Sequence, residues 1–139
     1  MKRRRGREYV LQLLFQFDFT GQRPNDEEFS AFWADKAEDE NLKGFVRDIL
    51  YGTIDHLSEI DTAISKAAEH WDIKRMATVD RNILRAATYE LLFRKDIPST
   101  VTINEAIDIA KKYSTTESAP FINGILDRIA KGLKDKRLR

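Results

Sequence analysis

The sequence predicts an all-α protein of about seven helices, and two observations carry this prediction. Apolar residues recur three and four positions apart along almost the whole chain, as on the buried face of a helix. Sustained period-2 alternation with hairpin turns, the usual sign of paired strands, does not occur. The 139 residues, of which 42% are hydrophobic, are enough for one core. We therefore expect a single domain over residues 1–139.

The first two helices are expected on either side of a turn at Gly21. A helix over residues 4–19 has an apolar face that further aromatic residues widen. That face consists of Val10, Leu13, Leu14 and Phe17. Asn25 is expected to begin a second helix, because Asn25 and Glu28, three residues later, have the types and spacing of a capping box.

The rest of the chain predicts further helices with breaks between them. A third helical stretch is expected to start near Asp39 or Asn41, and its spacing continues to Trp71. That is long for one globular helix, so a break or kink is expected at Gly52. Thr78 is the expected N-cap of the next helix, whose dense apolar pattern places it at the centre of the bundle. Thr102 is the expected N-cap of another helix, and Pro120 lies in the first turn of the last one.

Charge is distributed unevenly along the chain, although the net charge is only +1. A basic N-terminal arm covers residues 1–7, and a basic C-terminal tail, expected to fray, covers residues 132–139. Residues 25–40 are acidic instead. Basic ends around an acidic interior segment indicate a surface with one side that faces a polyanion.

Residues that carry catalysis or hold metals are scarce. The chain has no cysteine, which excludes disulfides, thiolate nucleophiles and thiolate metal sites. Its histidines, His56 and His70, lack the spacing of a metal-binding pair, and neither a GxGxxG nor a Walker A loop occurs. We therefore expect no enzyme activity, catalytic residue, metal or cofactor. Because no targeting segment or membrane-spanning apolar run is recognisable, the expected location is the cytoplasm.

The arginine-rich start is the main candidate for binding. Cations at a helix N-terminus oppose the helix dipole, at a cost of about 0.3–1 kcal/mol each. A polyanion docked there would offset this cost, because guanidinium groups donate paired hydrogen bonds to phosphate. Glu8 is spaced to pair with Arg4 and hold it in place. A disordered, solubilising tail explains the same residues equally well, so the run alone leaves both interpretations open.

Four longer stretches of the chain resemble one protein family. They are RRRGREYVLQLLFQFDF at the start, VDRNILRAATYELLF and IPSTVTINEAIDIAKKYS in the centre, and FINGILDRI near the end. In this order and spacing they are similar to the bacterial transcription antitermination factor NusB. The resemblance implies a fold of two packed three-helix bundles. At Gly6 the chain departs from the family, which often has a better helix former at this position. Two possibilities therefore stay open: the helix begins only after Gly6, and the arginine run stays disordered until RNA binds.

The resemblance also implies a function. Proteins of this family bind the boxA element of nascent RNA together with the small-subunit ribosomal protein that doubles as NusE. The pair helps to assemble an antitermination complex with other Nus factors on RNA polymerase, especially on ribosomal RNA operons. This chain is therefore expected to bind single-stranded boxA-type RNA and NusE.

The resemblance further implies which residues do this. By position, the RNA-binding residues are Arg3, Arg4, Arg5, Arg7, Glu8, Gln16, Glu117, Phe121 and Asn123. The residues expected near the NusE face are Asp80, Arg81 and Leu84. The side chains alone leave alternatives: Asn123 serves equally well as a structural hydrogen-bonding residue, and only the resemblance makes Phe121 a base-stacking rather than a core residue.

Two other functions fit parts of the sequence. One is a protein-binding helical scaffold, in which the arginines act only as a non-specific basic arm. The other is a fragment of an RNA cytosine-5 methyltransferase, to which NusB-like domains are also fused, but the glycine-rich cofactor loop and the cysteine nucleophile are lacking. Apolar surface at Tyr51, Trp71 or Phe93 would in addition support a homodimer.

Overall fold

A computed structural model describes the backbone of residues 2–138 and the side chains of residues 2–134. The regular elements of this part are α1 (Lys2–Thr20), α2 (Asp26–Phe32), α3 (Glu40–Asp55), α4 (Leu57–Ala68), the 3₁₀ turn η1 (Ile73–Arg75), α5 (Thr78–Phe93), α6 (Ser99–Tyr113) and α7 (Ser118–Leu138). The predicted all-α class with seven helices is confirmed. None of the helices in the described part combines the length and hydropathy that a bilayer crossing requires.

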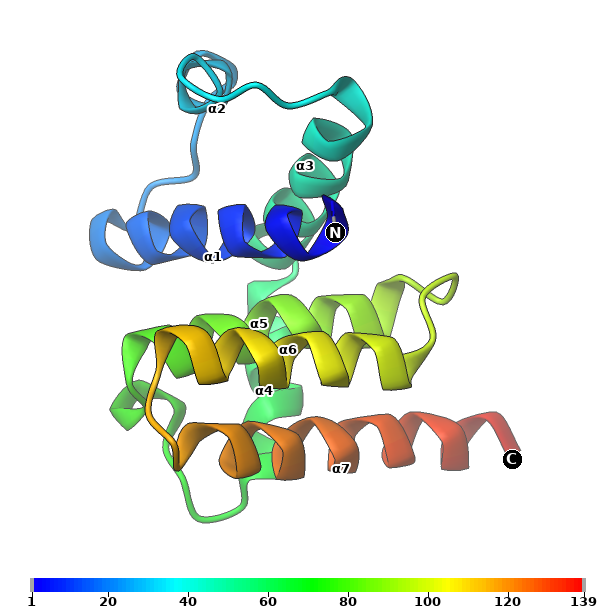
Figure 1. Cartoon of the computed structure of the whole chain (residues 1–139). Coiled ribbons are helices and arrows are strands. Elements are labelled where there is room, and N and C mark those ends of the chain that lie inside the picture. The colour runs from blue at the N-terminus through cyan, green and yellow to red at the C-terminus, as the bar shows by residue number, and fades with distance from the viewer. Residues whose placement is uncertain (1, 139) are drawn as a thin grey trace.

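The central helix of the fold is α5 (Figure 1). It packs against α1 and α3 on one side and against α4, α6 and α7 on the other. Helices α1, α2 and α3 form the first bundle, and α2 joins it through the rings of Phe32 and Phe29, whose centroids lie 5.7 Å from those of Tyr9 and Tyr51. Helices α5, α6 and α7 form the second, with α4 packed on α5 and α7. The predicted arrangement of two packed bundles is confirmed.

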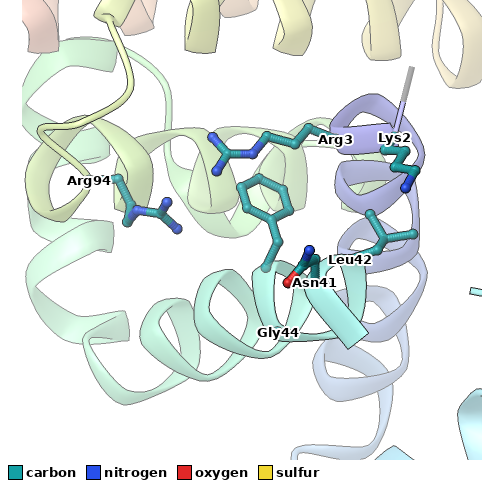
Figure 2. A pocket seen from close by; sticks show the side chains of 7 residues that line it. Lys2, Arg3, Asn41, Leu42, Gly44 and Arg94 are labelled. Carbon is teal, nitrogen blue, oxygen red and sulfur yellow. The ribbon is translucent and has the colours of Figure 1, made fainter. Parts of the chain in front are cut away.

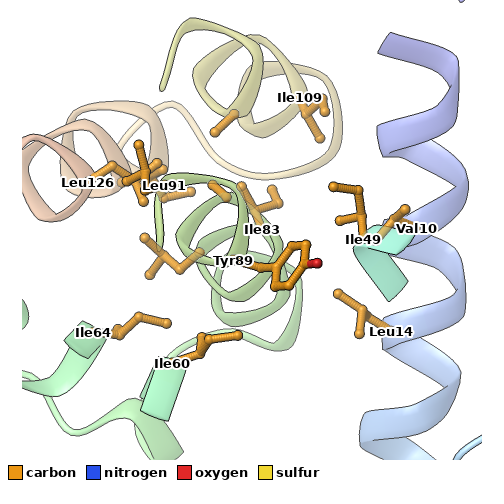
Figure 3. Packing of buried hydrophobic residues seen from close by; sticks show 14 of the residues in the cluster. Val10, Leu14, Ile49, Ile60, Ile64, Ile83, Tyr89, Leu91, Ile109 and Leu126 are labelled. Carbon is orange, nitrogen blue, oxygen red and sulfur yellow. The ribbon is translucent and has the colours of Figure 1, made fainter. Parts of the chain in front are cut away.

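The core lies where the two bundles meet. Figure 3 shows Val10 and Leu14 of α1, Ile49 of α3 and Ile83 of α5 around this junction. The side chains of Val10, Leu14 and Ile49 are fully buried. Burying one such side chain contributes roughly 1.5–3 kcal/mol. Because α5 is enclosed from both sides, it also buries polar residues, of which Glu90 is only 2% exposed.

Two of the expected helix starts are confirmed. At α2, the backbone N–H of Glu28 donates to Asn25 Oδ1 at 2.8 Å, and the backbone N–H of Asn25 donates to Glu28 Oε1 at 3.0 Å, which is the predicted capping box. At α3, the Asp39 side chain accepts from the backbone N–H of Leu42 at 2.8 Å. Both caps satisfy N–H groups that have no partner within the helix.

The break expected between residues 39 and 71 is present, but it lies at His56 and not at Gly52. Helix α3 continues to Asp55, and the chain changes direction at His56, where φ is −115° and ψ is 26°. Gly52 serves a close approach instead, because a Cβ at this position would lie 2.2 Å from the ring of Tyr89. The glycine therefore lets α5 pack tightly on α3.

The N-caps expected at Thr78 and Thr102 are also wrong. Ala77 occupies the cap position of α5 and Pro98 that of α6, and neither makes a side-chain cap hydrogen bond. Thr102 lies inside α6, where its hydroxyl donates to Glu90 at 2.9 Å. The hydroxyl thus satisfies a buried carboxylate rather than a helix end.

The last helix extends further than expected. Pro120 lies in its first turn, as predicted. Because α7 runs to Leu138, the fraying expected after Gly132 is wrong. The side chains of residues 135–139, which belong to the predicted basic tail, lie outside the described residues.

Candidate nucleic-acid interface

The arginine-rich run is part of α1 and not a tail before it. The helix begins at Lys2. The expectation of a helix that begins only after Gly6 is therefore wrong, and so is the expectation of a disordered arginine run. Gly6 is buried, and a Cβ on it would lie 2.9 Å from Cδ1 of Leu42 and 3.1 Å from a ring carbon of Phe45. The departure from the family pattern therefore allows α1 to approach α3 closely.

Arg4 points towards α6. Its Nη2 donates to Asp108 at 2.8 Å and its Nε donates to Glu105 at 3.0 Å, and these hydrogen bonds raise the pKa of Arg4. Glu8 accepts from Lys112 at 3.2 Å, so the expected pair between Glu8 and Arg4 is wrong. Helix α6 supplies the carboxylates that pair with Arg4 and the lysine that pairs with Glu8. Each of the two residues of α1 therefore has its partner on α6 and not on its own helix.

Arg5 points towards the segment between α2 and α3. Its Nε and Nη2 donate to the two carboxylate oxygens of Glu38 at 2.6 and 2.8 Å, and the Tyr9 hydroxyl donates to the same carboxylate at 2.6 Å. The hydrogen bonds from Arg5 and then Tyr9 lower the pKa of Glu38 to about 2. The Arg5 side chain is still 45% exposed, so a phosphate could reach it by displacing Glu38.

Arg7 is enclosed in the core. Its side chain is 8% exposed, and its Nε and Nη2 each donate to Glu90 at 2.8 Å. Glu105 accepts a third, longer hydrogen bond from Nη1 at 3.3 Å. The expectation of an RNA contact by Arg7 therefore needs correction in this structure, because its donors are aimed at buried carboxylates and not at solvent.

Arg3 is the arginine of the run with the most open surroundings. Among the described side chains, none of the carboxylates lies within ion-pair distance of Arg3, and its guanidinium lies 4.7 Å from the centroid of the Phe45 ring. Figure 2 shows Arg3 and Arg94 facing each other across a pocket of about 510 Å³. The other residues that line it are Lys2, Asn41, Leu42, Gly44 and Phe45. The pocket is open, and Arg3 offers it donors that none of the described carboxylates occupies, whereas Arg94 is paired with Asp48 and Asp96.

The other predicted RNA-binding residues lie away from this pocket. Gln16 is exposed and lines a groove of about 650 Å³ between the end of α1 and α2. Glu117 and Asn123 are exposed at the start of α7, and Phe121 is half-buried there. Helix α7 begins on the side of the molecule opposite the N-terminus of α1 (Figure 1).

The predicted residues therefore do not form one compact site. At about 1.5 Å per residue, the 19 residues of α1 alone extend over roughly 28 Å. A small ligand cannot touch both ends of such a surface. A flexible polyanion can, with phosphates near the start of α1 and bases near the start of α7.

Comparison with known proteins identifies the family. The model of the NusB family matches residues 4–131 of this chain. The chain belongs to the NusB family. The transcription antitermination protein NusB of Thermodesulfovibrio yellowstonii is 51% identical, over 94% of this chain and 93% of its own length. The resemblance found in the sequence is thus confirmed.

Solved NusB structures share the fold. The structure of NusB from T. maritima is 48% identical and has a TM-score of 0.84, over 93% of this chain and 90% of that protein. A crystal structure of the antitermination factors NusB and NusE in complex with double-stranded RNA is 28% identical and has a TM-score of 0.83, over 94% and 97%. These relatives are named as a transcription antitermination protein and as antitermination factors.

The residues expected at the NusE face are largely occupied within the fold. Asp80 is buried and accepts hydrogen bonds from Ser114 at 2.6 Å and from Ser118 at 2.8 Å. Arg81 donates to Asp18 at 2.6 Å. Leu84 is 0% exposed, so its expected contact with a partner is corrected here to a core position.

Two residues beside the predicted RNA-binding residues could not be assigned to that site from the sequence. Arg94, which donates to Asp48 and Asp96 at 2.9 Å each, reaches the Arg3 pocket only through the packing of α5 beside α3. Trp71 was expected only as leftover apolar surface, and it is 60% exposed. Of the other two residues with that expectation, Phe93 is 37% exposed, whereas Tyr51 is half-buried.

Proposed function

We propose that this chain is a transcription antitermination factor that binds single-stranded boxA-type RNA together with NusE. It acts in the cytoplasm, with the other Nus factors in the RNA polymerase antitermination complex, and supports transcription of ribosomal RNA operons. The observation that carries the proposal is membership of the NusB family over residues 4–131. Similarity over 94% of the chain to a NusB that was crystallised with NusE and RNA supports it further.

The start of α1 is the proposed phosphate-binding end. Arg3 is exposed over the pocket shared with Arg94, and Arg5 is half-exposed in spite of its pair with Glu38. Arg4 is 30% exposed and pairs with two carboxylates, so it contributes less to phosphate binding. Arg7 pairs with Glu90 in the core and stabilises the fold instead. The further residues proposed to face RNA are Glu8, Gln16, Glu117, Phe121 and Asn123, and those proposed near NusE are Asp80 and Arg81.

Salt dependence of RNA binding tests this proposal. Each phosphate that a cation neutralises on single-stranded RNA adds about −0.7 to the slope of log K against log salt. We expect Arg3→Ala to weaken binding and to make the slope shallower by about 0.7. Arg23→Ala is the matched control, because Arg23 is an exposed arginine outside the proposed interface, paired with Asp55 at 2.8 Å. An unchanged slope in Arg3→Ala would remove Arg3 from the interface.

The role of NusE is tested by gel shift with and without that protein. We expect tighter binding of boxA-type RNA in the presence of NusE, because the two proteins together present a composite surface. No RNA binding in either condition, with NusE still bound, would favour the alternative function of a protein-binding scaffold with a non-specific basic arm.

A further inference from the structure

An exposed tryptophan lies beside the start of α7. Trp71, in the segment between α4 and η1, is 60% exposed, whereas the other tryptophan of the chain, Trp33, is 6% exposed. The Trp71 ring meets the Phe121 ring edge-on, with centroids 5.4 Å apart and planes at 74°. This contact leaves most of the indole open to solvent.

The backbone holds Trp71 in this position. Glu69, two residues before it, has a φ of 55°, in the left-handed region. The backbone N–H of Trp71 donates to the carbonyl of Ala68 at 3.2 Å, and the Asp72 side chain accepts from the backbone N–H of Lys74 at 3.0 Å. The segment is therefore a defined turn, so little backbone freedom remains to be lost when something stacks on the indole.

The surroundings of Trp71 favour a nucleobase. Lys74 and Arg75 follow in η1, both are exposed, and neither has a carboxylate within ion-pair distance among the described side chains. An exposed aromatic ring with two exposed cations within four residues of it in the chain is a combination that binds an unpaired base and its phosphate. The partner ring, Phe121, belongs to the residues already proposed to face RNA, so this surface continues the proposed interface.

We infer that Trp71, supported by Phe121, is a stacking platform for one unpaired base of the bound RNA. The inference rests on the proposed function and adds a residue to it. Phe93, at the end of α5, is another exposed aromatic residue, at 37%, but its ring packs against His56 and Tyr89, and it lines neither the Arg3 pocket nor the groove of Gln16. It therefore serves as the matched control.

Tryptophan fluorescence gives a direct readout. A base stacked on an indole quenches its emission, and only Trp71 of the two tryptophans is accessible. We expect a short single-stranded boxA-type RNA to quench the wild-type protein, and inorganic polyphosphate, which has no bases, to leave it bright. In Trp71→Phe, the remaining emission of Trp33 should not respond to RNA.

Affinity gives the second readout. Trp71→Ala should weaken RNA binding by about 5- to 150-fold, the range measured for loss of one stacked base, with an unchanged salt slope because no phosphate contact is lost. Trp71→Phe should retain most of the affinity, and Phe93→Ala should equal wild type. Because Trp71 is exposed, each variant should keep the wild-type circular dichroism.

The outcomes separate this inference from the proposed function. If wild type binds RNA and Trp71→Ala binds it equally well, the platform is refuted and the proposed function stands. If NusE alone quenches Trp71 and RNA does not, the surface belongs to the protein partner and the inference is overturned. If wild type binds no RNA with or without NusE, both fail.

Discussion

Replacing Arg7 with methionine is expected to destabilise the fold rather than to remove an RNA contact. The substitution removes two hydrogen bonds of 2.8 Å. Among the described side chains, the Thr102 hydroxyl is then the one donor left to the Glu90 carboxylate, which is 2% exposed. Removing one member of a buried ion pair costs about 3–5 kcal/mol, since the other charge stays buried. Methionine keeps most of the packing of the arginine stem, so this figure reflects the lost charge. A domain that is stable by about 5–15 kcal/mol should lose about a fifth or more of that margin.

Urea unfolding followed by circular dichroism measures this loss as a lower midpoint at an unchanged slope. The double variant Arg7→Met/Glu90→Met should recover to within about 2 kcal/mol of wild type, because neither charge of this pair is then left buried without its partner. Arg23→Met, which breaks an exposed pair, should cost at most about 1 kcal/mol. A loss below about 1 kcal/mol in Arg7→Met, or losses that simply add in the double variant, would refute the reasoning.

Three further predictions concern the Glu38 carboxylate, which pairs with Arg5, and the close approach at Gly52 of α3. Glu38→Gln should strengthen RNA binding by up to about 5-fold, because it releases Arg5 from a competing carboxylate, and an unchanged affinity would show that Arg5 does not meet RNA. Because the pKa of Glu38 is lowered from 4.5 to about 2, its pair with Arg5 should persist down to pH 4 and be lost as the pH falls through about 2; a carboxyl NMR titration with a midpoint near 4.5 would contradict this. Gly52→Ala should destabilise the fold by about 1–3 kcal/mol, because the new Cβ would lie 2.2 Å from Tyr89, whereas Gly132→Ala, with open space around it, should be neutral or stabilising by up to about 1 kcal/mol. Equal unfolding midpoints for the two glycine variants would refute the close-approach argument.

The fold was largely predictable because helical periodicity and helix caps depend on residues that are close together in the sequence. The capping box at Asn25 needs only a residue three positions away, and it is present as expected. The errors arose where a distant residue decides the conformation. Gly52 permits the approach of Tyr89, and Thr102 satisfies Glu90, and neither partner can be identified from local spacing.

The candidate site shows the same division. The basic run was visible in the sequence, but the assignment of each arginine depends on carboxylates far along the chain. Arg7 and Arg3 have the same charge and lie in the same helix, yet one faces Glu90 in the core and the other faces an open pocket. Trp71 gives no local signal for binding, because an isolated tryptophan in a helical pattern is usually a core residue.

Chemical-shift mapping with boxA-type RNA, followed by NusE, tests RNA binding along α1 and α7 most directly. RNA should shift the amide signals of residues 2–5, of residues 117–123 and of Trp71, while Leu84 in the core should stay unchanged. NusE should then add shifts on a second surface and strengthen those caused by RNA. An RNA titration that leaves residues 2–5 and 117–123 unshifted, with and without NusE, would contradict the proposed interface.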